Sequence, residues 1–258
     1  MELRPSTELT RRELAELFTA AYEDYYVPFQ IDEARLAHMV EAFDLALDRS
    51  LVAWDGDTPV GLANLGLRGE RTWLGGVGVV KTHRRSGIGE QLTRALLDRA
   101  RKAGAREMVL EVITRNEPAI ALYEKLGFRT IRELEVLTLA AAENQSQASG
   151  LFLPYASRRI AGARTEAEPW QRDDVTVANL PDAAALGTDR AAAIFRMEGG
   201  RVNLLQAGGD DLRELLARLR VRGPILALNY PPGDPVTAAL HDAGATEVLR
   251  QLEMAIDL

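Results

Sequence analysis

The spacing of apolar residues changes from helical to strand-like near residue 50. Leu and Ala positions recur every three or four residues over Ser6–Tyr26, and again over Ile31–Asp48, with Pro28 between the two segments. This periodicity predicts two amphipathic helices. Beyond Asp48 the apolar positions alternate with a period of two, which is typical of strands. The predicted strands are Ser50–Trp54, Val60–Leu67 and Thr72–Val80, joined by turns at Asp55-Gly56-Asp57 and Gly69-Glu70.

Helical and strand patterns alternate over the next fifty residues. Gly104 and Gly127 each follow a helical pattern directly and are expected to end it in the left-handed conformation. The resulting alternation predicts an α/β domain. Its predicted elements are a helix over Glu90–Lys102, a strand over Glu107–Ile113, a helix over Asn116–Leu126 and a strand over Arg129–Leu139.

The stretch from residue 140 to residue 150 has almost no large apolar side chain and is typical of a linker. We therefore expect one domain over 1–140, a linker over 141–150 and a second domain over 151–258. The second half partly repeats the first: a hairpin over Ala191–Gln206, a helix over Asp210–Arg220 and a strand over Ile225–Asn229 follow in the same order. This order indicates either an internal duplication or the general likeness of α/β segments.

Composition excludes several classes of function. The 258 residues carry 31 Lys and Arg against 38 Asp and Glu, a net charge of −7, and both halves are acidic. A nucleic-acid ligand is not expected, because phosphate contacts need clustered basic residues. The chain has no cysteine, which excludes disulfides and thiolate chemistry, and its three histidines are too scattered to predict a metal site. The charged amino terminus and the lack of a membrane-length apolar run predict a cytoplasmic protein without a membrane partner.

The segment Val77–Glu90 has the pattern of an anion-binding loop. A strand leads through Gly87 and Gly89 directly into a helix. The first amides of a helix lack intrahelical acceptors, and glycine lets a phosphate oxygen approach the backbone closely. Arg84 and Arg85 add positive charge nearby. The loop has neither the Lys-Ser/Thr pair of a P-loop nor the third glycine of a dinucleotide fingerprint.

A second informative segment follows at Asn116–Phe128. Asn116 is a candidate helix cap, and Pro118 suits the first turn of the helix. Tyr123 lies seven residues after Asn116, so both residues fall on roughly the same helical face. Leu122, Leu126 and Phe128 are most simply explained as core residues.

Together, Arg84-x-x-Gly87-x-Gly89 and Asn116-x-x-Ala119-x-x-Leu122-Tyr123-x-x-x-Gly127-Phe128 resemble the GNAT family of N-acetyltransferases. The resemblance covers roughly Met1–Leu139. It implies a GNAT fold, with a mixed central sheet flanked by helices, and a second, smaller GNAT-like α/β domain. It also implies acetyl-CoA as donor, no metal, and a primary amine of a small molecule or peptide as acceptor. The residues implied to bind CoA are Val77, Gly78 and Val79 along the strand, Arg84, Arg85, Ser86, Gly87, Ile88, Gly89 and Glu90 in the loop, and Asn116 and Tyr123 in the segment after it.

The same resemblance suggests the catalytic groups. Tyr123 is implied to protonate the leaving thiolate, for which an ordinary phenol pKa near 10 is suitable; otherwise it is a half-buried helix aromatic. Glu111, twelve residues earlier, is similar to the general base of the ribosomal-protein alanine acetyltransferases. Alternatively, Glu111 is a strand carboxylate paired with Arg106 or Arg115. Water or another acid, with Glu23, Asp24 and Glu33 as reserves, are further candidates for the base.

An aromatic group of four residues precedes the predicted second helix. The family resemblance suggests that it walls the acceptor pocket, and ordinary packing between the two helices is the alternative. Its members are Tyr22, Tyr25, Tyr26 and Phe29.

The second half of the chain lacks the loop motif, and Leu240 stands where Tyr123 maps. We expect this half to be structural, as a pseudo-dimer partner within a monomer or in a homodimer, without productive CoA binding. The alternative function for the whole chain is a non-catalytic acyl-CoA-binding sensor or assembly module.

Overall fold

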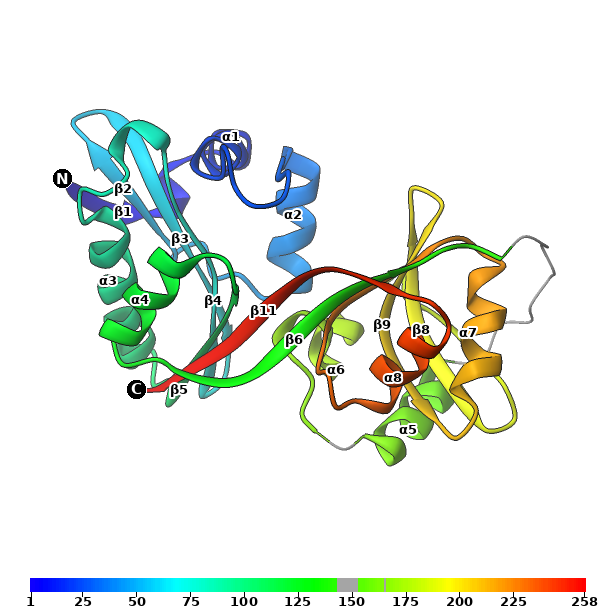
Figure 1. The fold of residues 1–258 in the computed structure, drawn as a ribbon. Coiled ribbons are helices and arrows are strands. Elements are labelled where there is room, and N and C mark those ends of the chain that lie inside the picture. The colour runs from blue at the N-terminus through cyan, green and yellow to red at the C-terminus, as the bar shows by residue number, and fades with distance from the viewer. Residues whose placement is uncertain (143–152, 165) are drawn as a thin grey trace. The chain divides into compact units, whose positions relative to one another are not determined.

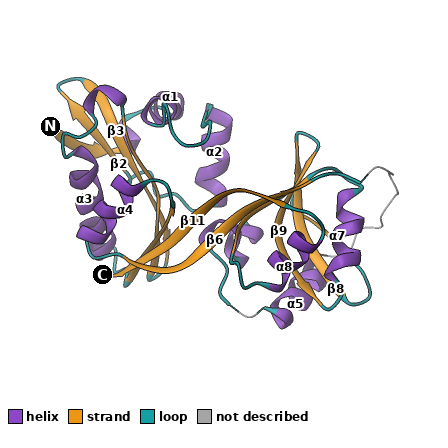
Figure 2. Cartoon of the chain, viewed as in Figure 1, coloured by secondary structure: helices purple, strands orange, loops and turns teal. Residues whose placement is uncertain are grey.

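The computed structural model describes residues 1–142, 153–164 and 166–258. The fold is a mixed α/β arrangement in which strands form sheets covered by helices (Figures 1 and 2). Its contacts separate into two compact units. Unit 1 comprises Met1–Ile131 together with Glu253–Leu258, and unit 2 comprises Arg132–Leu252.

The sheet of unit 1 is mixed. The strand order is β1-β2-β3-β4-β5, and β11, whose last residues belong to unit 1, follows β5. Neighbouring strands from β1 to β4 are antiparallel, whereas β4 and β5 are parallel. The strands are β1 (Glu2–Pro5), β2 (Leu51–Asp55), β3 (Thr58–Arg68), β4 (Arg71–Val79), β5 (Glu107–Ile113) and β11 (Thr246–Asp257).

Helices cover both faces of this sheet (Figure 1). On one face α1 and α2 bury an apolar core that includes Phe18, Leu36 and Leu62. On the other face Ile88 and Leu92 of α3 pack so closely over β3 that a side chain at Gly61 would touch both. The helices are α1 (Arg11–Ala21), α2 (Glu33–Ala42), α3 (Ile88–Lys102) and α4 (Glu117–Lys125).

A β-bulge in β4 opens the sheet of unit 1. The antiparallel register with β3 shifts where Gly75 and Gly76 stand opposite Asn64, and Gly76 has a positive φ of 126°. The parallel pairing of β4 with β5 extends only to Trp73, which pairs with Val109. Bulges bend and twist a strand locally. The end of β4, residues 77–79, is therefore left without a paired strand on its β5 side.

Unit 2 has a similar arrangement on a smaller scale. In its sheet β6 lies between β11 and β10, and the order continues as β9-β8-β7. Pairing is parallel between β10 and β9 and antiparallel from β9 to β7. The strands are β6 (Arg129–Leu139), β7 (Ala184–Gly187), β8 (Ala191–Glu198), β9 (Arg201–Gly209) and β10 (Ile225–Tyr230), and the helices are α5 (Leu153–Ala163), α6 (Asp174–Ala178), α7 (Leu212–Arg220) and α8 (Pro235–Asp242).

The boundary between the units differs from the expected one at residue 140. Most of β6 belongs to unit 2, because its residues 135–139 pair with β10. The chain then returns to unit 1 at its end, where the Leu258 amide donates to the Arg106 carbonyl at 2.9 Å. Hydrophobic periodicity predicts that β6 is a strand, but it does not determine which sheet the strand joins. The predicted linker lies outside the described residues except for 141 and 142.

Most predicted elements occur with shifted ends. The first helix begins only at Arg11, because Thr10 and Glu13 form a capping box there, and short 3₁₀ turns lie at Ser6–Glu8, Lys81–His83 and Trp170–Arg172. The second helix ends at Ala42 rather than Asp48. Among the described residues, no helix combines the length and the apolar character needed to cross a membrane.

Candidate active site

A groove of about 680 Å³ in unit 1 brings most of the predicted site residues together. It lies between the ends of α1 and β4 on one side and the beginnings of α3 and α4 on the other. The residues that line it include Tyr22, Tyr25, Tyr26, Val77, Gly78, Val79, Arg84, Arg85, Gly87, Gly89, Glu90, Asn116 and Tyr123.

The start of α3 forms one end of the groove. Gly87 is the N-cap in the left-handed conformation, with φ of 84°, and it has no side chain with which to cap the helix. A Cβ on Gly87 would meet nothing within 4 Å, and one on Gly89 would meet only Leu122, at 3.9 Å. The backbone is therefore approachable from the groove, and the first-turn amides of α3 suit an anion such as a diphosphate.

The two loop arginines differ in what they contact. Arg85 is exposed, has a positive φ of 63°, and makes no ion pair with any described residue. The Arg84 guanidinium instead donates to three backbone carbonyls, those of Val79, Ala21 and Glu23. The positive charge of Arg85 is the one left available for a ligand.

The end of β4 lies directly against α1. The Tyr22 hydroxyl donates to the Val77 carbonyl at 3.4 Å. A Cβ on Gly78 would come within 2.8 Å of the Ala21 Cβ and 2.9 Å of the Tyr22 ring. Only glycine at position 78 therefore lets the aromatic ring rest on the strand.

Tyr123 on α4 faces a largely apolar surrounding. Its side chain is 7% exposed, and its ring makes an edge contact with Phe128 at a centroid distance of 5.6 Å. Burial raises the pKa of Tyr123 far above that of an ordinary phenol, and nearby Tyr25 contributes to the shift. The phenol thus stays protonated at neutral pH and can act as a proton donor.

Asn116 connects α4 with the aromatic segment after α1. It occupies the N-cap position of α4, but its side chain does not form the predicted capping hydrogen bond. Burial raises the pKa of Tyr25, and a side-chain hydrogen bond with Asn116 partly opposes that shift. Tyr25 in turn packs edge-on against Tyr22 and Tyr26.

Four predicted residues lie outside the groove lining. Phe29 packs against Phe18 and Tyr22 in the core between α1 and α2. Ile88 is buried, and the Ser86 hydroxyl donates to the His83 carbonyl. These side chains support the loop and the wall without facing the groove.

The fourth residue is Glu111 on β5, which is half-buried and accepts a hydrogen bond from the Trp73 indole at 2.7 Å. The ring of Trp73 contacts Phe43, which follows α2. Glu111 is therefore held beside the strand opening and does not line the part of the groove that Tyr123 faces.

The groove also includes residues that sequence reasoning did not assign to it. Pro118, Ala119 and Leu122 line it from α4, and Ala119 stands one helical turn before Tyr123. Residues four apart on a helix lie on the same face, so the spacing of Ala119 and Tyr123 could have predicted that both line the groove. Glu23 and Asp24, considered above as reserve bases, also line the groove. Among the described residues, no group of three or more His, Asp or Glu side chains is arranged to hold a metal ion.

Comparison with known proteins gives one family match. Residues 12–128 match the sequence model of the Acetyltransferase (GNAT) family. Over 64 residues the chain is 41% identical to N-alpha-acetyltransferase 30 of Schizosaccharomyces pombe, a match that covers 25% of this chain and 43% of that protein. The chain thus spans less than half the length of this curated relative.

Solved structures resemble the chain over nearly its whole length. The GCN5-related N-acetyltransferase from Sphaerobacter thermophilus matches with a TM-score of 0.71 and 14% sequence identity. The match covers 99% of this chain and 95% of the Sphaerobacter chain. A tandem GNAT protein from the clavulanic acid biosynthesis pathway has a TM-score of 0.64 at 13% identity, covering 99% and 98%. Sequence identities of 13–14% show a shared fold and nothing more. The structural similarity confirms the predicted GNAT fold with a second GNAT-like domain.

Proposed function

We propose that this chain, whose residues 12–128 match the Acetyltransferase (GNAT) family, transfers an acetyl group from acetyl-CoA to the primary amine of a small molecule or peptide. The observation that carries the proposal is a single groove lined both by the uncapped start of α3 and by the buried phenol of Tyr123. A diphosphate and an acyl thioester belong to the same donor molecule, and the groove offers a partner for each.

The donor is held mainly by backbone groups. Its diphosphate accepts hydrogen bonds from the first amides of α3, beyond Gly87, with the charge of Arg85 nearby. Its extended arm runs along the end of β4, residues 77–79, which has no paired strand on its β5 side. The Val77 and Val79 carbonyls already accept hydrogen bonds from Tyr22 and Arg84, so the backbone amides of this open strand edge are the groups that suit an amide-containing arm.

The reaction requires two proton movements. The neutral amine nitrogen attacks the thioester carbonyl carbon, the C–S bond breaks, and the thiolate takes the Tyr123 proton. The attacking nitrogen loses its own proton to a base, and the phenolate regains one from solvent. The Tyr123 phenol is protonated at neutral pH, as any phenol with a pKa near or above 10 is, so it has a proton to give when the thiolate forms.

Glu111 is proposed as the base. Its hydrogen bond from Trp73 holds the carboxylate in one orientation beside the strand opening. Since Glu111 does not line the same groove as Tyr123, the proton from the amine reaches it through water. Glu23 and Asp24 also line the groove, and because Asp24 is paired with Lys81, the Glu23 carboxylate and the neighbouring aromatic rings are the groups that suit an amine acceptor.

Titration calorimetry with acetyl-CoA tests the donor site directly. We expect saturable binding of one acetyl-CoA per chain, located in unit 1. The absence of binding at millimolar acetyl-CoA would refute the proposal. Binding with slow release of free CoA, and no acetylated product from a broad panel of amines and peptides, would favour the non-catalytic alternative.

A further inference from the structure

The Arg84 side chain joins two segments that are far apart in the sequence. Its Nε donates to the Val79 carbonyl at 3.1 Å, and its Nη2 donates to the Ala21 carbonyl at 3.2 Å and to the Glu23 carbonyl at 2.6 Å. Val79 ends β4, whereas Ala21 and Glu23 lie at the end of α1. One guanidinium thus ties the donor loop to the segment that follows α1.

The carbonyls at the end of α1 are suitable partners for a cation. The last carbonyls of a helix lack intrahelical donors and carry the negative end of the helix dipole. Arginine can serve diverging carbonyls at once because its donors are fixed in a planar fork. The carbonyls at the end of α1 are therefore better satisfied by the Arg84 guanidinium than by solvent.

The segment held in this way is the aromatic wall of the groove. Residues 22–26 include Tyr22, Tyr25 and Tyr26, and all three line the groove. The segment turns sharply at Asp24, which has a positive φ of 59° and pairs with Lys81 at 2.7 Å. Lys81 precedes Arg84 by three residues, so the donor loop contacts the wall through two side chains, Lys81 and Arg84.

We propose that Arg84 is a positioning residue for the acceptor wall, and that its side chain is not a ligand of the donor diphosphate. The inference rests on the proposed function, because it takes the groove to hold a donor at the loop and an acceptor at the wall. Arg84 couples these two parts: it fixes residues 22–26 in the orientation that presents their rings to the groove. The diphosphate is left to the α3 amides and Arg85.

We call the three hydrogen bonds of the Arg84 side chain the clamp. Hydrogen–deuterium exchange of the ligand-free protein measures how firmly the clamp holds residues 22–26, and it needs no knowledge of the acceptor. The amides of Tyr22, Glu23 and Tyr25 each donate to a carbonyl within the α1 end, so their exchange reports opening of the segment. In Arg84→Met and Arg84→Lys we expect these amides to exchange roughly tenfold faster or more, because hydrogen bonds to a charged group are lost. Lysine keeps the charge but lacks the fork.

Calorimetry with acetyl-CoA on the same variants separates the clamp from a phosphate contact. Both Arg84 variants should bind acetyl-CoA within about threefold of the wild type. The matched control is Arg85→Met in the same loop, where we expect the reverse: wild-type exchange over residues 22–26 and roughly tenfold weaker acetyl-CoA binding.

Two outcomes would overturn the inference. One is unchanged exchange over residues 22–26 in Arg84→Met. The other is a loss of acetyl-CoA affinity in Arg84→Met as large as that in Arg85→Met. Failure of the wild type to bind acetyl-CoA would instead refute the proposed function, while the exchange of the ligand-free variants would still report on the clamp.

Discussion

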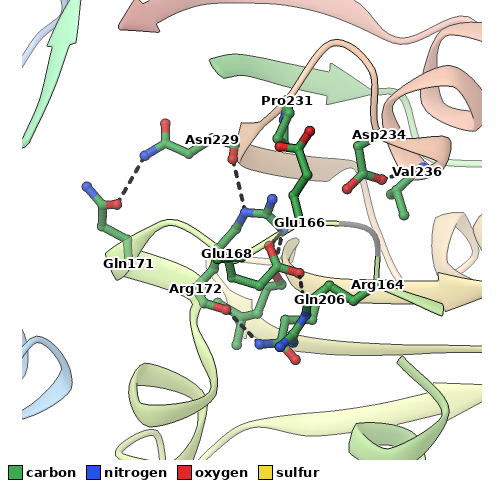
Figure 3. Close-up of polar contacts among 12 residues, drawn as sticks. Arg164, Glu166, Glu168, Gln171, Arg172, Gln206, Asn229, Pro231, Asp234 and Val236 are labelled. Carbon is green, nitrogen blue, oxygen red and sulfur yellow. Dashed lines mark hydrogen bonds and ion pairs between the residues drawn. The ribbon is translucent and has the colours of Figure 1, made fainter. Parts of the chain in front are cut away.

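The two units share a β-bulge at the same place in their sheets, but they differ in what lies beside the strand end that follows it. In each, a parallel pair of strands is followed by a β-bulge: at Gly75 and Gly76 of β4 in unit 1, and at Leu205 of β9 in unit 2. In unit 1 the strand end beyond the bulge lines an open groove. In unit 2 the Asn229 carbonyl of β10 accepts a hydrogen bond from Arg172 (Figure 3). The Leu205 carbonyl accepts another from the same side chain.

Arg172 is built into the interior of unit 2. Its side chain is 2% exposed, pairs with Glu168 at 2.7 Å, and stacks on the Tyr230 ring at 3.6 Å. Gln206 donates to the Arg172 carbonyl, which also fixes its backbone. Where two strands separate, their backbone carbonyls lose their partners and need hydrogen-bond donors from another group, which we call the occupant. In unit 2 that occupant is the buried Arg172. In unit 1 the Val77 and Val79 carbonyls accept hydrogen bonds from Tyr22 and Arg84, and the strand end still lines a groove.

The helix starts differ in the same sense. Gly87 and Asn116 precede α3 and α4 without side-chain caps, whereas Asp211 and Asp234 cap α7 and α8 with their carboxylates. The cavity near these caps in unit 2 has about 40 Å³ and is also lined by Glu168. A diphosphate would meet negative charge there rather than free amides, so we expect unit 2 to bind no CoA.

The largest effect is expected from Tyr123→Phe. Loss of the proton donor should lower kcat by about 10²- to 10⁴-fold with little change in acetyl-CoA affinity. Steady-state kinetics with any amine that serves as substrate would measure it. Tyr155→Phe, at an exposed residue of unit 2, is the control and should keep full activity. An unchanged kcat in Tyr123→Phe would remove this phenol from the mechanism.

Breaking the buried pair in unit 2 should cost stability rather than donor binding. Glu168→Gln leaves the Arg172 charge buried without its partner, so the free energy of unfolding should fall by about 3–5 kcal/mol. Urea titration would measure the loss. The double variant Glu168→Leu with Arg172→Met should recover much of it, because a matched apolar replacement removes both charges. A double variant as unstable as Glu168→Gln would contradict this account.

A smaller effect is expected from Gly87→Ala. A Cβ there has free space, but an alanine at φ of 84° costs about 1–2 kcal/mol of backbone strain. Acetyl-CoA affinity should fall roughly tenfold as the loop shifts to relieve that strain. Gly199→Ala is the matched control: it has φ of 56° and equal space in a hairpin turn of unit 2, and should lower stability without changing affinity. Equal affinities in the two variants would argue against the loop as the diphosphate site.

The local elements of the chain followed from its sequence. The strands Glu107–Ile113 and Arg129–Leu139 were predicted with their observed ends, and so was the glycine stop at Gly127. Periodicity and caps act within a few residues, so the sequence displays them directly. The loop around Gly87 and the phenol of Tyr123 were recognisable because their spacing reflects one strand, one loop and one helix.

Tertiary structure alone decided how the distant parts meet. The strand β1 was not predicted, because its pairing, such as that of Leu3 with Ala53, joins residues fifty positions apart. The same holds for the division of β6 between the units, for Arg84 at the end of α1, and for Arg172 between two strands. The strand pairings depend on which segments meet in the sheet, and the contacts of the two arginines depend on which backbone carbonyls the fold leaves without donors. That is settled only when strands from different parts of the chain come together, whereas helix periods and turn glycines are determined by the sequence itself.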